Sequence, residues 1–593
     1  MGPASFVGSY RITGNKVIIR LRNQICDSAE ELLESGLCLE IVKRAVAALQ
    51  KRGSILLGIF GGRVVDDAGI STLMQVLQFL EKMDADRVAC VVPGSEDFFR
   101  DRNLLNDFVE YLYNFWRGFE RFIVCDSEGD QLDRRPYRTF NRTIENLTSL
   151  VRHTYREIQE NISGTHPRIY RQIAAGAEMA TIATPKAIPY PGGAYQKLAP
   201  LSVVRQILFY PPLVLDPPNN KRTGKFERIQ ENPLEWCNFS RDEWLCYPVK
   251  AGDTLVHVYF SEKFFELGLS MANLFELASD EDLKRKPDAV YLYGLSDDQF
   301  RAPEDVFPTV FFDDEANGIL VGAVPARDEF GYFGYLKKMI MTLHNIKKIQ
   351  SGRMPFHGAF MKIHLKGKKP ATLLLMGDTG AGKSETVEAM RGFGADLIQD
   401  VIVIADDMGS LELKEDGTVL GYGTETGAFS RLDDLKPGFA LGQIDRAIIM
   451  NPYQVNARIA LPITTFANVV KGHTVDFVLY ANNYEDIDED HPVIERFETS
   501  EEALKTFRDG AVMSKGTTRT MGLVHTYFSN VFGPVQYRAE HDVLARKFFE
   551  AFYKKGIFVG QMRTRLGVPG WERKGPEESA KALLDLIRND QRY

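Results

Sequence analysis

The chain has 593 residues, enough for several domains or for two large ones. Its 44% hydrophobic and 26% charged content is close to the globular average, which excludes a wholly disordered, collagen-like or coiled-coil protein. The formal net charge of −8 argues against nucleic acid as a partner, because such binding depends on basic residues that neutralise phosphates. An anionic ligand would therefore need a local basic pocket.

The sequence predicts a cytoplasmic protein that does not bind membranes. No apolar run approaches the roughly 20 residues that a membrane-spanning helix needs. The N-terminal residues lack the basic start and apolar stretch of a signal peptide. The 6 cysteines include no C-x-x-C pair, so we expect reduced, mostly buried thiols.

The first half of the chain reads as a mixed α/β region. Apolar residues at helical spacing predict helices over 29–52 and 71–83, and the apolar run 54–60 predicts a buried strand between them. Prolines are concentrated between residues 185 and 218, which argues against long helices and central strands there. We expect that stretch to form ordered loops or a connection between two halves.

The second half carries sharper strand signals. Short apolar runs, rich in β-branched residues and leucine, occur at 371–377, 401–405, 447–450 and 476–481, and turns or helical patterns separate them. The sequence therefore predicts an α/β protein with an N-terminal domain over 1–330 and a C-terminal domain over 331–593.

A phosphate-binding loop is the most specific motif. Residues 377–384 read GDTGAGKS, which matches G-x-x-x-x-G-K-[ST] directly after a predicted strand and before a helical pattern. Backbone N–H groups of such a loop and the helix N-terminus bind phosphate, the lysine reaches its outer oxygens, and the hydroxyl ligates a divalent cation. The predicted nucleotide-binding residues are Gly377, Asp378, Thr379, Gly380, Ala381, Gly382, Lys383 and Ser384.

Two adjacent carboxylates follow the next strand. Asp406 and Asp407 come directly after the run at 401–405, so they emerge at the edge of the sheet where a triphosphate would lie. Oxygen ligands in that position favour a divalent metal, and Ser384 would complete the set from the phosphate-binding loop.

Several separated motifs together resemble ATP-dependent phosphoenolpyruvate carboxykinases. Residues 332–338 (YFGYLKK) resemble that family's Y-x-G-x-x-K-K, and 357–361 (HGAFM) stand where the family has a HCSAN-like strand. The phosphate-binding loop and the double aspartate follow in the family's order.

Further matches extend the resemblance over much of 330–593. Residues 425–431 (ETGAFSR) resemble E-x-G-x-Y-x-K, and 456–462 (NARIALP) resemble N-x-R-x-x-x-P. Arg573 and Ser579 resemble the family's arginine and threonine before a C-terminal helix. In the first half, 58–63 (GIFGGR) resembles the substrate strand G-x-F-T-G-R, although Val-Val-Asp-Asp follows where the family has Ser-Pro-x-Asp-Lys.

The resemblance implies a fold with an N-terminal substrate domain and a C-terminal nucleotide domain. It also implies decarboxylation of oxaloacetate and transfer of the ATP γ-phosphoryl group to the enolate, giving phosphoenolpyruvate, with Mn²⁺ or Mg²⁺ as cofactor. Lys338, His357 and Asp407 would be metal ligands, with Asp406 and Ser384 beside them.

The remaining predicted residues are mostly cations. By the resemblance, Arg63 and Arg458 would bind the substrate carboxylate and phosphoryl oxygens, and Tyr332 would contact the substrate. Lys337 would help to lower the pKa of Lys338, and Lys383 would act on the transferred phosphoryl group. Nucleotide contacts are expected from Arg431, Arg573 and Ser579.

Two alternatives remain open at this stage. The segment GDTGAGKSET also resembles the HPr kinase/phosphorylase family, which shares this type of nucleotide domain, so the chain could phosphorylate another small molecule or a protein hydroxyl. A nucleotide sensor without catalysis is the non-enzyme alternative. The sequence does not distinguish ATP from another phosphoryl donor, nor does it indicate the oligomeric state.

Overall fold

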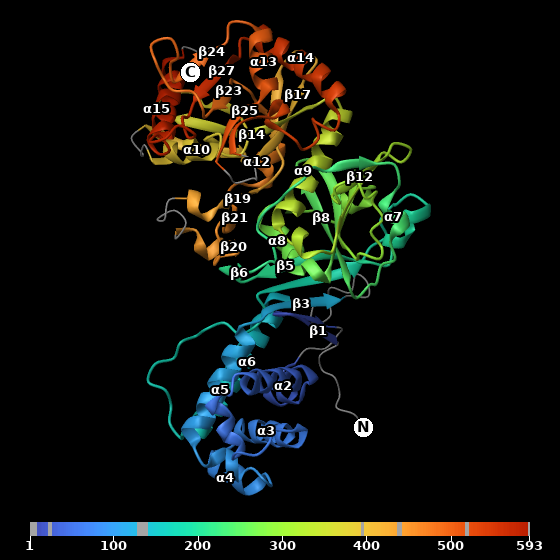
Figure 1. Ribbon diagram of the computed structural model, residues 1–593, viewed down its shortest axis with the longest axis vertical. Coiled ribbons are helices and arrows are strands. Elements are labelled where there is room, and N and C mark those ends of the chain that lie inside the picture. The colour runs from blue at the N-terminus through green and yellow to red at the C-terminus, as the bar shows by residue number, and fades with distance from the viewer. Residues whose placement is uncertain are drawn as a thin grey trace. The chain divides into compact units, whose positions relative to one another are not determined.

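The computed structural model describes residues 9–21, 26–126, 140–392, 397–435, 442–515 and 521–590. The fold is mixed α/β, with large sheets that combine parallel and antiparallel strands. The chain forms two compact units (Figure 1). Unit 1 comprises residues 1–186 and 202–210, and unit 2 comprises 187–201 and 211–593. The predicted domain boundary near residue 330 falls inside unit 2.

Unit 1 combines a five-strand sheet path with a group of helices. Its elements are β1 (Ser9–Thr13), β2 (Lys16–Leu21), α1 (Ala29–Glu34), α2 (Gly36–Lys51), the 3-10 helix η1 (Ile55–Phe60), α3 (Asp67–Leu80), α4 (Ala85–Val91), η2 (Glu96–Phe99), α5 (Arg102–Arg117), β3 (Glu120–Asp126), α6 (Phe140–Ser163), β4 (Met179–Pro185) and β5 (Ser202–Phe209). The strands pair in the order β1-β2-β3-β4-β5, and the two inner pairs are parallel.

The predicted strand over 54–60 is wrong, because η1 occupies this segment. Gly53 and Gly61 flank it with φ of 63° and 66°, so the chain turns at both ends. The Ser54 side chain accepts a hydrogen bond from the backbone N–H of Leu56, which favours a tight helical turn. The helix predicted over 29–52 forms as α1 and α2, interrupted at Ser35, whose side chain caps α2.

The proline-rich stretch 185–218 connects the two units. A connection was one of the two alternatives expected for it, and ordered loops were the other. It nevertheless contains β5, whose eight residues pair antiparallel with β4. The reason is local, since no proline lies within 202–209. Residues 187–201 belong to unit 2, so the chain passes between the units three times in this region.

The described residues of unit 2 form three main sheets. The first has the order β8-β9-β11-β13-β12-β7, the second has the order β22-β18-β17-β14-β15-β23-β27-β24 with β16 paired to β14, and the third has the order β19-β21-β20-β6. The strands of the first sheet are β7 (Glu227–Ile229), β8 (Trp244–Ala251), β9 (Thr254–Ser261), β11 (Ala289–Leu295), β12 (Val310–Asp314) and β13 (Ile319–Pro325), with β10 (Glu276–Leu277) paired to β8.

The strands of the second sheet are β14 (Met354–Leu365), β15 (Ala371–Met376), β16 (Ile398–Ala405), β17 (Met408–Leu413), β18 (Val419–Gly423), β22 (His473–Thr474), β23 (Phe477–Asn482), β24 (Ile494–Arg496) and β27 (Phe558–Arg563). The third sheet consists of β6 (Leu213–Leu215), β19 (Gly427–Arg431), β20 (Ile448–Met450) and β21 (Arg458–Pro462). A separate hairpin joins β25 (Ala511–Lys515) to β26 (Met521–His525). All four strand runs predicted in the second half form strands, at β15, β16, β20 and β23.

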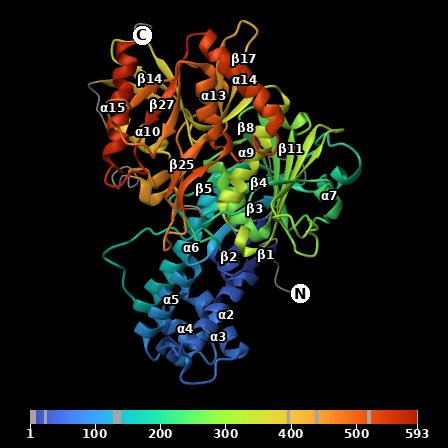
Figure 2. The same cartoon turned by 45° about the horizontal axis from the view of Figure 1, so that its top comes forward.

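Helices cover both faces of the second sheet (Figure 2). α13 (Ser500–Asp509) and α14 (Arg538–Lys554) pack on Leu374 and Val478, whereas α10 (Lys383–Gly392) and α15 (Lys574–Asn589) pack on Leu373 and Phe477. Consecutive strand residues point to opposite faces, which explains these almost unbroken apolar runs. The other helices of unit 2 are α7 (Pro233–Trp236), α8 (Phe265–Ser270), α9 (Phe333–Gln350) and α12 (Phe466–Val470).

Helix α9 is buried on nearly all sides. It contacts β8, β9, β11 and β13 of the first sheet and β14 and β17 of the second, and it lies between these sheets in Figure 1. Its buried residues include charged Lys337 and Lys348, which therefore need partners inside unit 2. No helix in the described ranges combines the length and apolar character that would let it cross a membrane.

We predict that the stability of unit 2 falls as the pH drops from 6.5 to 4. Burial lowers the pKa of His541 on α14 from 6.5 to about 4, so in this window the unfolded chain binds the proton more tightly than the folded one. The free energy of unfolding should fall by up to about 1.4 kcal/mol per pH unit through this residue. Urea unfolding measured at several pH values should show that the free energy of unfolding of His541→Gln changes less steeply with pH than that of the native chain. The exposed His525→Gln is the control, and an unchanged slope in His541→Gln would contradict the prediction.

Candidate functional site

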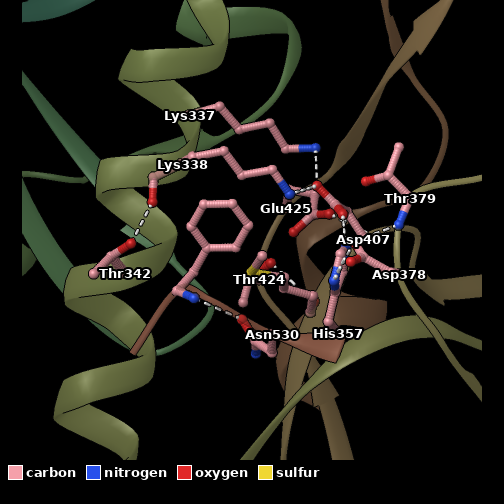
Figure 3. A network of polar contacts seen from close by, with 12 residues as sticks. Lys337, Lys338, Thr342, His357, Asp378, Thr379, Asp407, Thr424, Glu425 and Asn530 are labelled. Carbon is pink, nitrogen blue, oxygen red and sulfur yellow. Dashed lines mark hydrogen bonds and ion pairs between the residues drawn. The ribbon is translucent and has the colours of Figure 1, made fainter. Parts of the chain in front are cut away.

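The carboxylate of Asp407, just after β16, lies close to the amino groups of two lysines from α9 (Figure 3). The Oδ2 atom of Asp407 lies 2.6 Å from Lys337 Nζ and 2.8 Å from Lys338 Nζ. The Lys337 side chain is only 3% exposed. α9 and β16 thus bring together three predicted residues from distant parts of the chain.

His357 on β14 approaches the other oxygen of the same carboxylate. Its Nε2 lies 3.0 Å from Asp407 Oδ1, and its Nδ1 lies 2.5 Å from the backbone carbonyl oxygen of Ser529. A carbonyl oxygen only accepts, so Nδ1 carries the proton. Burial lowers the pKa of His357 against the opposing effect of Asp407, and the short Nε2–Oδ1 contact requires a proton or a cation between these two atoms.

The pKa values of the two lysines are shifted in opposite directions. Burial opposes the charge of Lys337, but Asp407 and Glu425 outweigh it and raise its pKa. Burial, with Lys337 as an adjacent like charge, lowers the pKa of Lys338 to about 8 despite the attraction of Asp407. Burial would raise the pKa of Asp407, but the two lysines hold it well below its usual range. Lys338 is therefore the amine that loses its proton most readily.

Glu425 is a second buried carboxyl beside Asp407. Its Oε1 accepts a hydrogen bond from the backbone N–H of Asp407 at 3.1 Å, and its Oε2 is buried without a hydrogen-bond partner among the described residues. Burial raises its pKa to about 8. The sequence indicated Glu425 only as part of the segment 425–431, and its proximity to Asp407 was not predicted.

The phosphate-binding loop runs from β15 to α10, as predicted. Gly380 and Gly382 have φ of 80° and 93°, and a Cβ on Gly382 would lie 2.6 Å from the Thr564 hydroxyl, so glycine is required there. Lys383 is 7% exposed, and its Nζ donates to the backbone carbonyls of Gly377 at 2.7 Å and Asp378 at 2.8 Å. Burial lowers its pKa.

Two arginines and two aromatic rings lie close to the lysine cluster. The Arg222 guanidinium carbon lies 4.8 Å from the ring centre of Phe532, and Lys338 Nζ lies 4.6 Å from the same centre. Burial raises the pKa of Tyr332 against the opposing effect of the nearby Arg458 and Arg222. Arg222 also interacts electrostatically with Asp378 of the loop.

Asparagines fix the backbone segments that carry these arginines. Asn220 Nδ2 donates to the carbonyl of Val455 at 2.7 Å, and Asn456 Nδ2 donates to the carbonyl of Asn220 at 2.6 Å. Asn451 donates in the same way to the carbonyl of Pro217. Asn451 and Asn456 have φ of 54° and 74°, a strained conformation that such bonds maintain.

Some predicted residues lie elsewhere or have internal partners. Arg63 belongs to unit 1, where its 71% exposed side chain pairs with Asp97 at 3.0 Å. The strand expected before it is η1, so that part of the family match is not reproduced. Arg573 is exposed just before α15, and Ser579 is buried with its hydroxyl donating to the carbonyl of Arg563 at 2.9 Å.

The other predicted residues surround the cluster. Asp406 precedes Asp407, Ser384 is exposed near the start of α10, and Arg431 on β19 pairs in register with Arg458 on β21. Arg431 also lies 3.5 Å from Asp433. Their contacts with nucleotide or metal stay predictions.

Arg222 is the main residue that sequence reasoning missed. It follows the proline-rich stretch and precedes Thr223-Gly224, where no recognisable motif marks it. Its link to the lysine cluster comes only from folding, through Phe532 and Tyr335. The Tyr335 hydroxyl accepts from the backbone N–H of Thr223 at 2.9 Å.

The residues at Asp407 fit a divalent cation by their chemistry. The carboxylate of Asp407, a neutral His357 Nε2 and a lysine amine with a lowered pKa are oxygen and nitrogen donors of the type that Mn²⁺ accepts. Within the described ranges, no cluster of three or more His, Cys, Asp or Glu side chains suited to a metal occurs. The proposed donor set therefore depends on the amine of Lys338.

Comparison with known proteins supplies no family. No protein-family model matches the chain, and no curated protein matches it significantly.

Replacing Asp407 tests how far the cluster depends on one negative charge. We predict that Asp407→Asn lowers the free energy of unfolding by about 3–5 kcal/mol, because it leaves two buried ammonium groups without a counter-charge. Chemical denaturation measures this. The control Asp297→Asn, which breaks an exposed pair with Arg327, should change stability little. Equal stability of both variants would contradict the prediction.

Proposed function

We propose that this chain is a nucleotide-dependent phosphoenolpyruvate carboxykinase. The observation that carries the proposal is the convergence of Lys338, His357 and Asp407 on one point, in the same unit as a strand-loop-helix phosphate site. The motif resemblance supplies the reaction, and it implies the finer fold of a substrate domain next to a nucleotide domain. ATP is the proposed phosphoryl donor.

The proposed reaction has two parts. The C–C bond to the leaving carboxylate of oxaloacetate breaks, CO₂ departs, and the electron pair remains as an enolate. The enolate oxygen then attacks the γ-phosphorus of ATP, and ADP leaves. A divalent cation held by Lys338, His357 and Asp407 would supply Lewis-acid stabilisation of the enolate oxygen.

The protein's own cations have distinct tasks in this scheme. Lys383, at the start of α10, would neutralise charge on the transferred phosphoryl group. Arg222 and Arg458 would bind substrate carboxylate and phosphoryl oxygens, since an arginine fork suits both. Lys337 keeps its proton because its pKa is raised, so it adds a fixed positive charge beside Lys338. Tyr332, which interacts electrostatically with Arg458, would help to orient that guanidinium.

One observation favours the kinase alternative. The predicted carboxylate-binding Arg63 has a largely exposed side chain that pairs with Asp97, whereas a substrate anchor is expected to be buried. If neither Arg63 nor Arg222 binds a dicarboxylate, the same nucleotide site could phosphorylate a hydroxyl group on another small molecule or a protein.

A substrate screen separates these functions. Purified protein with Mn²⁺ and ATP is given oxaloacetate, and a parallel set receives phosphoenolpyruvate, bicarbonate and ADP. A panel of hydroxyl acceptors tests the kinase alternative. Carboxykinase activity requires ATP-dependent conversion of oxaloacetate in the first set. Phosphorylation of a hydroxyl acceptor without it would establish the alternative.

Lys383→Ala should reduce ATP-dependent phosphoryl transfer by at least about 10²-fold, because a cation is removed from the transferred group. Steady-state kinetics measure this, and thermal unfolding should show only a modest change. Lys362→Ala on β14 provides a lysine control outside the loop. Normal turnover of Lys383→Ala would contradict the role given to the loop.

Arg222→Gln tests the substrate side of the proposal. With oxaloacetate, we predict a fall in kcat/KM of about 10²-fold, which corresponds to about 2.7 kcal/mol, with nucleotide affinity nearly unchanged. Arg63→Gln is measured in parallel, because the resemblance gives this role to Arg63. Arg228→Gln, an exposed arginine on β7 that pairs with Glu315, is the control. An effect confined to Arg63→Gln would exclude Arg222 as the anchor.

A further inference from the structure

The described residues of unit 1 include two separate clusters of buried apolar side chains. The first joins α2, α3, α5 and α6 and includes Val42, Leu77 and Tyr155. The second packs helices against β2 and β3 and includes Ile41 and Ile123. Side chains from both clusters line one cavity of about 160 Å³, so the cavity lies where the two clusters meet. Figure 1 shows α2, α5 and α6 near one another in this unit.

Most polar side chains along this cavity direct their donors into the surrounding backbone, and the Tyr155 hydroxyl donates to the carboxylate of Glu110. Arg121 donates to the carbonyl of Phe119 at 2.6 Å, and Trp116 and Tyr113 donate to backbone carbonyls at 2.6 and 3.0 Å. The hydroxyls of Ser35 and Thr154 donate to carbonyls of their own helical segments at 2.7 and 2.9 Å. These groups therefore present mainly carbon atoms to the cavity.

A cavity of this chemistry is unsuited to water. A buried water needs two to four polar partners, and apolar cavities of about 150 Å³ stay dry and bind benzene or xenon. The apolar lining is partly open to solvent, so an apolar occupant that covers it removes this surface from water and stabilises the fold. The Arg121 guanidinium is already used by backbone carbonyls and Glu178, which disfavours a charged ligand.

We propose that unit 1 binds a small uncharged apolar ligand in this cavity, with the bulk of a single aromatic ring or of an alkyl group of about six carbons. The ligand would join the helical and the sheet-facing clusters into one core. This site lies within unit 1 and is independent of the function proposed for unit 2.

The direct test is a crystal of the full chain pressurised with xenon. The proposal requires a xenon peak bounded by Ile41, Leu77 and Ile123. In solution, benzene should raise the melting temperature of unit 1 by several degrees, whereas benzoate at the same concentration should not. Absence of xenon from this cavity, or an equal effect of benzene and benzoate, would overturn the proposal.

Two matched variants on α2 assign the effect to this cavity. Val42 lines it, and Val46, one turn later, is buried in the same cluster but is not part of the lining. Val42→Phe should fill the space and abolish the benzene-induced shift, whereas Val46→Phe should retain the shift on a less stable background. A shift that survives Val42→Phe contradicts the assignment.

Cysteine labelling gives a readout in the unmodified chain, should either variant fold poorly. Cys38 lines the cavity, whereas Cys90 is exposed and outside it. Benzene should slow alkylation of Cys38 by N-ethylmaleimide at least threefold and leave that of Cys90 unchanged, as followed by mass spectrometry of peptides. Equal rates at Cys38 with and without benzene would count against the proposal.

Discussion

The site in unit 2 depends on the ion pairs that the Asp407 carboxylate forms with Lys337 and Lys338. A helix as buried as α9 can carry adjacent lysines only if a counter-charge meets them, and the end of β16 supplies it. The same carboxylate meets His357, so it also fixes β14 relative to α9. Because its partners come from α9 and β14, the position of this charge couples the packing of the two large sheets to the chemistry between them.

The sequence was most informative where local geometry and chemistry coincide. The loop 377–384 forms between β15 and α10 as predicted, because glycines at positive φ and a following helix are local properties of the chain. Asp407 could be placed because it directly follows a strongly apolar strand. Its convergence with Lys338 and His357 required the family's motif order, since nothing in the spacing alone shows that α9 lies beside β16.

Residues whose role arises from tertiary contacts were not accessible in this way. Arg222 stands in an irregular segment, and only the folded chain brings it to the Phe532 ring beside Lys338. The run 54–60 predicts a strand although the structure has a helical turn there, because a short apolar stretch fits either one. The flanking glycines at positive φ and the Ser54 cap favour the helical turn over a strand. Likewise, a proline-rich region can contain a paired strand wherever the prolines leave a gap, as at β5.

The repeated passage of the chain between the units affects how they could be separated. β5 pairs with β4 of unit 1 but follows a segment, 187–201, that belongs to unit 2. A fragment ending at residue 186 would therefore expose the edge of β4, with unpaired N–H and C=O groups that favour aggregation. A single proteolytic cut between 187 and 201 would leave β5 joined covalently to unit 2 while still paired with β4. Release of an intact unit 1 requires a second cut after β5, so resistance to dissociation after one cleavage is a property of this topology.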